Sequence, residues 1–203
     1  MGRNKEMNEL MKDERKKQIL SSALKLFSTK GLVATKIADI AKDAGFSQGL
    51  IYHYYKSKNE IFVELIDIAF SRMINATLEL EKMELESLAK IRFAYDELLK
   101  IYINDDDASR FHLLIAMAST SEGIPEEAKI IIEQNFKKPY EVIAKIIEMG
   151  QKDGTIVLKS SVELSMLFWS TINGLAIYRA AHGSDFVKPD TEIFMSMFKN
   201  KEE

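Results

Sequence analysis

The residues with the most recognisable chemistry lie close together, just before residue 60. Gln48 and Tyr52 are four residues apart, so a helix presents both on one face. Ile51 and Tyr55 share the opposite face and can anchor that helix on a core. A glutamine near the start of a helix in the major groove can pair with both hydrogen-bonding atoms of an adenine edge. The spacing therefore predicts a short helix that reads DNA.

Neighbouring side chains suit the DNA backbone. Donors that match phosphate oxygens are found on Thr35, Tyr52, His53 and Tyr54. Gly49 leaves room for the backbone to approach a phosphate closely. Lys58 begins a further helix, where its charge and the helix dipole both attract a phosphate. Aromatic clusters are also typical of core packing, and we expect Tyr55 to belong to the core. For His53 two roles remain open, a contact with DNA or an ordinary surface position.

Three short helices are expected to position these groups. They cover residues 13–30, 36–44 and 47–55. Gly31 can end the first helix because glycine tolerates positive φ. Thr35 and Ser47 have hydroxyl groups that can cap the second and third helices. Two short helices joined by a tight glycine turn and held by a preceding helix form a helix-turn-helix.

A set of spaced positions around this helix-turn-helix follows one pattern. They are Ile19, Ala23, Leu26, Phe27, Gly31, Thr35, Ile40, Ala41, Ala44, Gly45, Phe46, Ser47, Gln48, Gly49, Ile51, Tyr52, Tyr54, Tyr55, Lys58 and Glu60. With this composite, residues 13–62 resemble the DNA-binding part of the tetracycline-repressor (TetR) family of bacterial transcription regulators. The resemblance implies a homodimer on a pseudo-palindromic operator, with one recognition helix in each half-site.

The resemblance also implies roles for single residues. It places DNA contacts at Thr35, Ser47, Gln48, Gly49, Tyr52, Tyr54 and Lys58. Lys36 stands where a second threonine is common, and we expect it to add a phosphate contact. Ala38 replaces a longer polar residue and is expected to make less contact than its counterparts. Leu50 faces outward, where it can touch a thymine methyl group.

Charge divides the chain near residue 60. Residues 1–60, here called the head, hold 12 lysines and arginines against 7 acidic residues, a net charge of +5. Residues 61–203, the body, hold 16 against 24, a net charge of −8, so the total of −3 conceals the division. We expect the head to be a DNA-binding domain with a flexible polar arm at residues 1–12, and the body to be a ligand-binding and dimerisation domain. The basic arm is either a solvated surface or a contact with the DNA backbone.

The whole chain is predicted to be all-α. Apolar residues recur at helical spacing, and only three prolines and nine glycines interrupt them. Ser57 and Glu60 form a capping box at the start of a long helix. The helices expected in the body cover residues 58–82, 86–104, 108–119, 126–152 with a kink at Pro139, 161–182 and 189–199.

The segment 161–182 is apolar around nearly its whole circumference, which indicates a helix buried on two sides. Members of the TetR family pair their last two long helices. The resemblance therefore implies a dimer interface formed by residues 161–182 and 190–199, where Gly174 permits close approach.

Aromatic residues and methionines give the body an adaptable interior. The candidates for a ligand-binding pocket are Phe93, Tyr95, Tyr102, Phe111, His112, Met117, Phe136, Tyr140, Phe168, Trp169, Asn173 and Tyr178. At helical spacing such residues more often belong to an ordinary core. Asn173 either orients a ligand or bonds to another helix. His112 is expected as a satisfied or surface histidine rather than a metal ligand, because no second ligand lies three or four residues away.

Several classes of function find no support. The chain has no cysteine, no glycine-rich phosphate loop and only three scattered histidines, so we expect no enzyme, no metal site and no cofactor. The acidic run at residues 105–107 is expected to cap a helix rather than chelate a cation. The N-terminus has no apolar core of a signal peptide, and polar residues interrupt the most apolar segment. These features favour a cytoplasmic protein without a membrane role.

Together these features predict a ligand-responsive transcriptional regulator. In this hypothesis it is a repressor that a small, largely apolar molecule releases from the operator. The ligand acts through the helix at residues 58–82, which joins body and head, by changing the separation of the two recognition helices. The alternative is a TetR-like activator, or a non-specific DNA-binding or interaction protein without a small-molecule inducer.

Overall fold

The computed structural model describes residues 2–200, apart from the side chains of residues 2–6, 8 and 184. Within that range the chain is all-α and contains no strand. The helices are α1 (Gly2–Ala34), α2 (Ile37–Asp43), α3 (Gln48–Tyr54), α4 (Lys58–Lys82), α5 (Ser87–Asn104), α6 (Asp106–Ser119), α7 (Glu126–Asn135), α8 (Lys138–Lys152), α9 (Ser161–His182) and α10 (Thr191–Met195). A single turn of 3-10 helix, Gly183–Asp185, follows α9.

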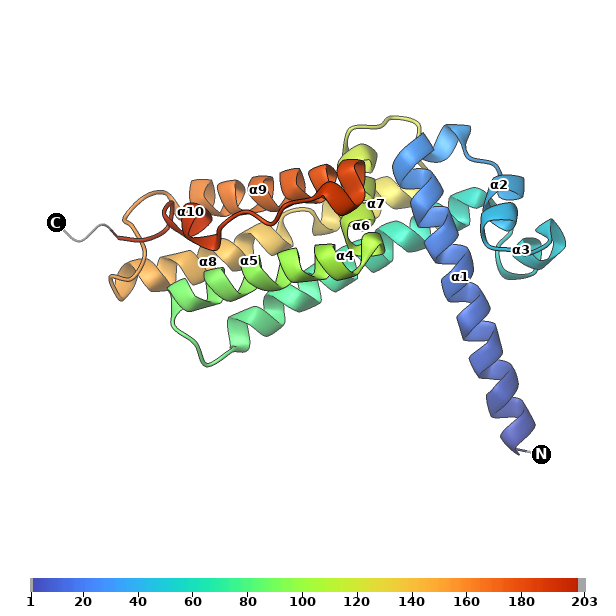
Figure 1. The fold of residues 1–203 in the computed structure, drawn as a ribbon, viewed down its shortest axis with the longest axis horizontal. Helices are drawn as coiled ribbons and strands as arrows, with labels where there is room; N and C mark the ends of the chain where they lie inside the picture. Colours follow the sequence, from blue (N-terminus) through green and yellow to red (C-terminus); the bar gives the residue numbers. More distant parts are fainter. Residues whose placement is uncertain (1, 201–203) are drawn as a thin grey trace.

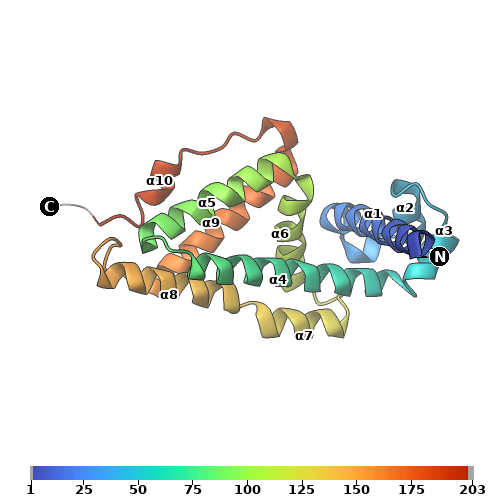
Figure 2. The same ribbon diagram turned by 90° about the horizontal axis from the view of Figure 1, so that it is seen from below.

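The head and the body lie at opposite ends of an elongated molecule. Helices α1, α2 and α3 form the head, while α5, α8 and α9 run roughly along the body (Figure 1). Helix α4 extends from the head well into the body, and α6 crosses between the body and α1 (Figure 2). Two helices therefore connect the two parts directly.

The expected helix starts around the turn are confirmed. Ser47 Oγ accepts a hydrogen bond from the backbone N–H of Leu50 at 3.2 Å. Ser57 Oγ accepts one from the N–H of Glu60 at 3.3 Å, and the Glu60 carboxylate accepts one from the N–H of Lys56 at 2.5 Å. These contacts satisfy amides that the first turn of a helix leaves free. Gly31 has a φ of 77°, as expected for the end of the packed part of α1.

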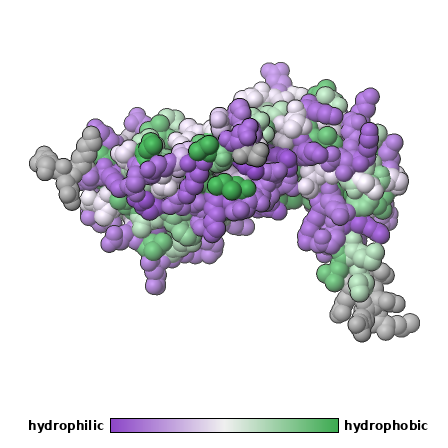
Figure 3. Space-filling view, viewed as in Figure 1, coloured by the Kyte–Doolittle hydropathy of each residue, from purple (hydrophilic) through white to green (hydrophobic). Residues whose placement is uncertain are grey.

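The N-terminal segment differs from the expected flexible arm. From residue 2 onward it forms the first turns of α1, which project away from the rest of the molecule (Figure 1). The segment is rich in Lys, Glu, Met and Leu, which favour helix, so the packed helix can propagate outward. Figure 3 shows apolar surface on this projecting part, where Met7, Leu10 and Met11 are exposed.

Two further boundaries differ from expectation. The helix expected at 126–152 is two helices, because α7 ends at Asn135 and Pro139 lies in the first turn of α8. Proline lacks the N–H that would bond to the carbonyl of Asn135, and its ring would clash there. The helix expected at 189–199 is reduced to the five residues of α10, which begins where Asp190 accepts a hydrogen bond from the N–H of Glu192.

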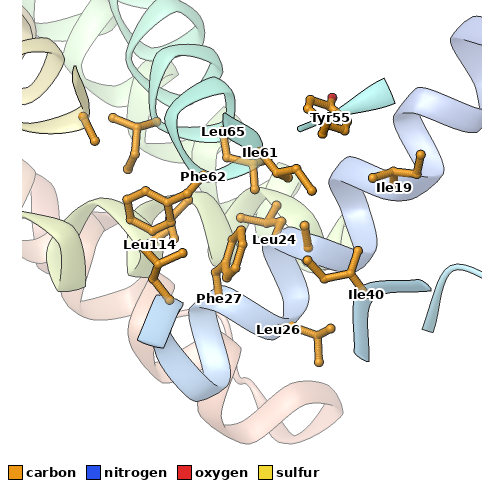
Figure 4. Close-up of a cluster of buried hydrophobic side chains, with 14 of the residues drawn as sticks. Ile19, Leu24, Leu26, Phe27, Ile40, Tyr55, Ile61, Phe62, Leu65 and Leu114 are labelled. Atoms are coloured by element: carbon orange, nitrogen blue, oxygen red, sulfur yellow. The ribbon is translucent and has the colours of Figure 1, made fainter. Parts of the chain in front are cut away.

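The head shares its hydrophobic core with the body. Phe27 of α1 packs edge to face on Phe62 of α4, with ring centroids 5.5 Å apart. Leu114 of α6 belongs to the same buried cluster, and Figure 4 shows its side chain beside those two rings. The change in charge near residue 60 therefore does not coincide with a gap in the packing.

Candidate DNA interface and ligand cavity

Helix α3 presents a polar outer face, as its spacing predicts. Ile51 and Tyr55 are buried against the head, whereas Gln48, Tyr52 and His53 are exposed. Tyr52 is a large aromatic residue that is 55% exposed, so packing within the chain does not account for it. The ring of His53 lies edge to face on that of Tyr54, which is half-buried.

Most of the residues predicted to contact DNA are exposed. Those exposed in the structure are Lys36, Ser47, Gln48, Gly49, Tyr52 and His53. Lys36 directly precedes α2, where its backbone N–H donates to the carboxylate of Asp39 at 3.0 Å and its side chain stays exposed. Ala38 is exposed as well, and Leu50 is half-buried. Contact with DNA remains a prediction for each of these residues.

Thr35 and Lys58 are placed differently from the prediction. Thr35 is 0% exposed, and its hydroxyl donates to the carbonyl of Gly31 at 2.8 Å instead of capping α2. The ammonium of Lys58 donates to three backbone carbonyls, those of Leu32 at 2.8 Å, Val33 at 3.0 Å and Thr35 at 2.8 Å. An ammonium has three N–H groups, so all its donors are engaged. In this structure both side chains secure the end of α1 rather than face outward.

A cavity of about 370 Å³ lies in the body, walled by α4, α5, α6 and α9. Its lining is largely apolar. The predicted pocket residues that line it are Phe93, Tyr102, Phe111, His112, Phe168 and Trp169. They come from three helices that are distant in sequence, so the sequence identified much of one cavity wall.

The other predicted pocket residues do not line this cavity. They are Tyr95, Met117, Phe136, Tyr140, Asn173 and Tyr178. The ring of Tyr95 is buried and stacks on Phe194 with centroids 3.9 Å apart, so it belongs to the core. Met117 of α6, Tyr178 of α9 and Phe136, between α7 and α8, are exposed. Residue type and helical spacing alone therefore do not tell whether a side chain lies in the core, on the surface or in the cavity wall.

Sequence reasoning missed the wall formed by α4. The residues that α4 contributes are Ala69, Arg72, Met73, Ala76, Thr77 and Leu80. Small and apolar residues recur there at intervals of three and four beyond the end of the head core. That spacing is the available signal in the sequence, although it equally fits a helix that only connects head and body.

His112 is the best-positioned polar group of the cavity wall. Its Nδ1 atom lies 2.9 Å from Oδ1 of Asn173, a bond between α6 and α9. Asn173 thus bonds to another helix, one of the two roles left open for it. Burial lowers the pKa of His112, and the contact with Asn173 opposes this shift only in part. The imidazole is therefore neutral at pH 7.

Charged residues occur at one side of the cavity. The guanidinium of Arg72 lies 4.9 Å from the ring centroid of Phe111, in a cation–π arrangement. Glu97 pairs with Lys100 at 3.2 Å, and Asp105 caps α6 by accepting a hydrogen bond from the N–H of Asp107. The expected capping role of the acidic run is confirmed. Residues 2–200 contain no cluster of side chains suited to hold a metal ion.

The acidic run also ties α6 to its neighbours. Asp106 pairs with Arg179 of α9 at 2.7 Å, and Arg179 donates to the carbonyl of Tyr102 at 2.9 Å. Asp107 pairs with Arg110 at 2.8 Å and accepts a hydrogen bond from Ser21 of α1 at 2.6 Å. The start of α6 is thus bonded both to the cavity wall and to the head.

Comparison with known proteins decides the family. The family profile "Bacterial regulatory proteins, tetR family" matches residues 19–65. The HTH-type transcriptional repressor KstR2 of Mycolicibacterium smegmatis is 32% identical over 162 residues, which cover 76% of this chain and 73% of that protein. The chain belongs to the TetR family. Members of this family are DNA-binding transcriptional regulators.

Other TetR-type relatives agree in sequence and in fold. The HTH-type transcriptional regulator YdgC of Bacillus subtilis is 31% identical over 150 residues, 74% of this chain and 65% of that protein, so the match spans slightly less than two thirds of its length. The crystal structure of the MbdR regulator from Azoarcus sp. CIB superposes with a TM-score of 0.77 at 23% identity, covering 90% of this chain and 95% of that one. This likeness shows the same fold. None of the described helices of the present chain is long and apolar enough to cross a membrane.

Proposed function

We propose that this TetR-family regulator is a homodimeric repressor that leaves a palindromic operator when a small, largely apolar molecule enters the cavity. In this proposal residues 1–60 bind DNA, and residues 61–203 bind the ligand and the second subunit. The observation that carries the proposal is the apolar cavity of about 370 Å³ between helices that also contact the head. Ligand sites have volumes of roughly 300–1,000 Å³.

Two helices can carry a change in the cavity to the head. Helix α6 contributes Phe111 and His112 to the cavity, and one turn further it contributes Leu114 to the core of the head. Helix α4 lines the cavity over its second half, and Lys58 at its start holds the end of α1. A ligand that displaces either helix therefore shifts α1 and the recognition helix packed with it.

A shift of this kind weakens operator binding in a dimer. Two half-sites one helical turn apart, about 34–36 Å, require a fixed separation of the two α3 helices. The ligand has to bind the released state more tightly than the DNA-bound state, because equal binding shifts no equilibrium.

The outer face of α9 supports the proposed dimer. It carries exposed apolar residues along its length, namely Val162, Met166, Leu167, Ile177 and Tyr178. Several large apolar side chains exposed on one helix are typical of a protein interface. The second helix expected in the interface, at 190–199, does not fit, because Phe194, Met195 and Phe198 of that segment are buried in the core. Helix α8, which packs beside α9 and exposes Met149, takes its place in the proposal.

The proposal is tested by fluorescence anisotropy with two duplexes of equal length, the DNA upstream of the gene and a random sequence. We expect preferential binding to the first. Gln48→Ala should remove about 1–3 kcal/mol of this preference at one base pair. Lys36→Ala should weaken both complexes and reduce the slope of log affinity against log salt by about 1, whereas Lys82→Ala at the body end of α4 should change neither.

Equal affinity of the unaltered protein for both duplexes would contradict an operator. It would favour the alternative of a non-specific DNA-binding protein. Reporter transcription with and without the regulator then separates repression from activation.

A further inference from the structure

The imidazole of His112 is a hydrogen-bond acceptor of the cavity wall that its contact with Asn173 holds in a fixed orientation. Oδ1 of Asn173 has only lone pairs, so Nδ1 of His112 must be the donor in their contact at 2.9 Å. In a neutral imidazole whose proton is on Nδ1, Nε2 has a free lone pair. Nε2 bonds to none of the described residues, and the half-buried ring lines the cavity. This nitrogen is therefore available to a ligand.

Two unpaired donors belong to residues whose rings lie near that of His112. The hydroxyl of Tyr102 and the indole N–H of Trp169 are buried and have no hydrogen-bond partner within the described part of the chain. Their residues are 1% and 3% exposed, and both line the cavity. The His112 ring lies 5.4 Å from the ring of Tyr102 and 6.5 Å from that of Trp169, measured between centroids. A buried donor without an acceptor costs roughly 1–3 kcal/mol, so two of them at one place call for a function.

We infer that the cavity binds an apolar alcohol or phenol whose hydroxyl group donates a hydrogen bond to Nε2 of His112. A hydroxyl suits this wall because one oxygen atom both donates to the acceptor and accepts from an adjacent donor. A carbonyl cannot donate to Nε2, and an ammonium has no lone pair to accept from the hydroxyl of Tyr102 or the indole N–H of Trp169. The inference rests on the proposed function, since it takes the cavity as the ligand site.

The size of the cavity limits the ligand. A volume of about 370 Å³ equals the liquid volume of about a dozen water molecules at roughly 30 Å³ each. Away from His112 the wall includes Ala69, Met73, Leu80, Leu98 and Phe168. A compound with one hydroxyl and about a dozen carbon atoms matches this volume and this lining.

The chain contains its own probe for the test. Trp169 is the only tryptophan, so tryptophan fluorescence of the full chain reports on the cavity wall. The protein is titrated with 4-hexylphenol and with 4-hexylanisole, its methyl ether, which keeps the apolar body and the oxygen but lacks the donor. We expect both compounds to change the fluorescence, and the phenol to bind about tenfold more tightly, as expected for one hydrogen bond.

Variants identify the acceptor. In His112→Phe the two compounds should bind within about twofold of each other, because the acceptor is gone and the apolar wall is kept. His182→Phe, which alters an exposed histidine at the end of α9, should retain the tenfold preference. Asn173→Leu should reduce the preference as well, since it removes the group that fixes the proton on Nδ1, and it decides the matter if His112→Phe does not fold.

The outcomes separate the inference from the proposed function. Equal binding of both compounds to the unaltered protein, or a preference that survives in His112→Phe and Asn173→Leu, overturns the inferred hydroxyl while leaving the cavity a ligand site. Fluorescence and melting temperature that respond to neither compound overturn the cavity as a ligand site, and with it both proposals.

Discussion

Lys58 stabilises the fold, although the sequence pattern at this position indicates a contact with DNA. Its ammonium donates to the carbonyls of Leu32, Val33 and Thr35, at the end of α1 where unpaired carbonyls and the helix dipole favour a cation. Lys58→Met keeps the length of the side chain but removes every donor. We expect the free energy of unfolding to fall by about 1.5–3 kcal/mol, measured by urea denaturation.

The matched control is Lys56→Met, which removes an exposed lysine two residues earlier. It should change stability by less than about 0.5 kcal/mol. In the DNA-binding assay, a structural role predicts that Lys58→Met weakens binding without changing the salt slope, whereas a phosphate contact would lower that slope. Unchanged stability together with a lower slope would return Lys58 to the DNA interface.

His112 makes stability depend on pH in a predictable direction. Burial holds the pKa of His112 below its usual value of 6.5. The unfolded chain therefore takes up a proton near pH 6.5, while the folded chain takes it up only at lower pH. The contribution of His112 is complete above pH 6.5 and is lost as the pH falls through the folded pKa. Between pH 7.5 and 5.5 the melting temperature should fall more steeply for the unaltered protein than for His112→Gln, and His182→Gln should behave like the unaltered protein.

At the scale of helices, α8 packs most closely at Gly150. A Cβ atom there would lie 2.6 Å from Cδ1 of Ile156 and 2.8 Å from Cβ of Ser87 at the start of α5. Gly150→Ala should therefore destabilise the fold by about 1–3 kcal/mol in chemical denaturation, although alanine favours helix. Gly49→Ala on α3 is the control for the unfolding measurement, because the nearest atom to its Cβ position, Oγ of Ser47, is at an ordinary contact distance of 3.9 Å. Equal stability of the two variants would show that the contact at Gly150 is not tight.

The ends of helices could be predicted wherever they depend on local contacts. Ser47 and Ser57 cap α3 and α4 through hydroxyl groups three residues from the amides they satisfy, so the signal lies in adjacent residues. The end of the chain could not be predicted in this way. Phe194 and Phe198 are buried, and Lys199 forms an isolated bridge with Ile156, so contacts across the fold replace the expected helix.

The sequence predicts those residues of the DNA interface and the cavity that share one face of a single helix. Gln48 and Tyr52 lie on the face that the spacing predicts, and Phe168 and Trp169 line the cavity. The cavity itself arises where α4, α5, α6 and α9 meet, which no single helix encodes. For that reason Arg72 and Met73 were missed, and exposed Tyr178 was included.

For the whole molecule, the proposed dimer explains how a chain with a net charge of −3 approaches DNA. The head has a charge of +5 and lies at one end, away from most of the body, which has a charge of −8 (Figure 1). Pairing along α9 would join two bodies and leave both heads free to face the same duplex. The acidic bodies would then stay away from the phosphates, while two basic heads attract them.

This arrangement predicts that a charge on the outer face of α9 disrupts both assembly and DNA binding. Met166 is exposed in the middle of that apolar face, so Met166→Glu would bury an unpaired carboxylate in the proposed interface. Sedimentation velocity should show dimers of the unaltered protein and monomers of the variant at micromolar concentration. Affinity for the operator should fall at least about tenfold, because each monomer contacts a single half-site.

Leu85→Glu provides the control for the added charge. Leu85 is also exposed, but it lies on the loop between α4 and α5, away from α9 (Figure 1). This variant should remain dimeric and bind the operator with nearly unchanged affinity. Dimers of Met166→Glu with full affinity would place the interface elsewhere, whereas monomers with full affinity would show that a single head accounts for operator binding.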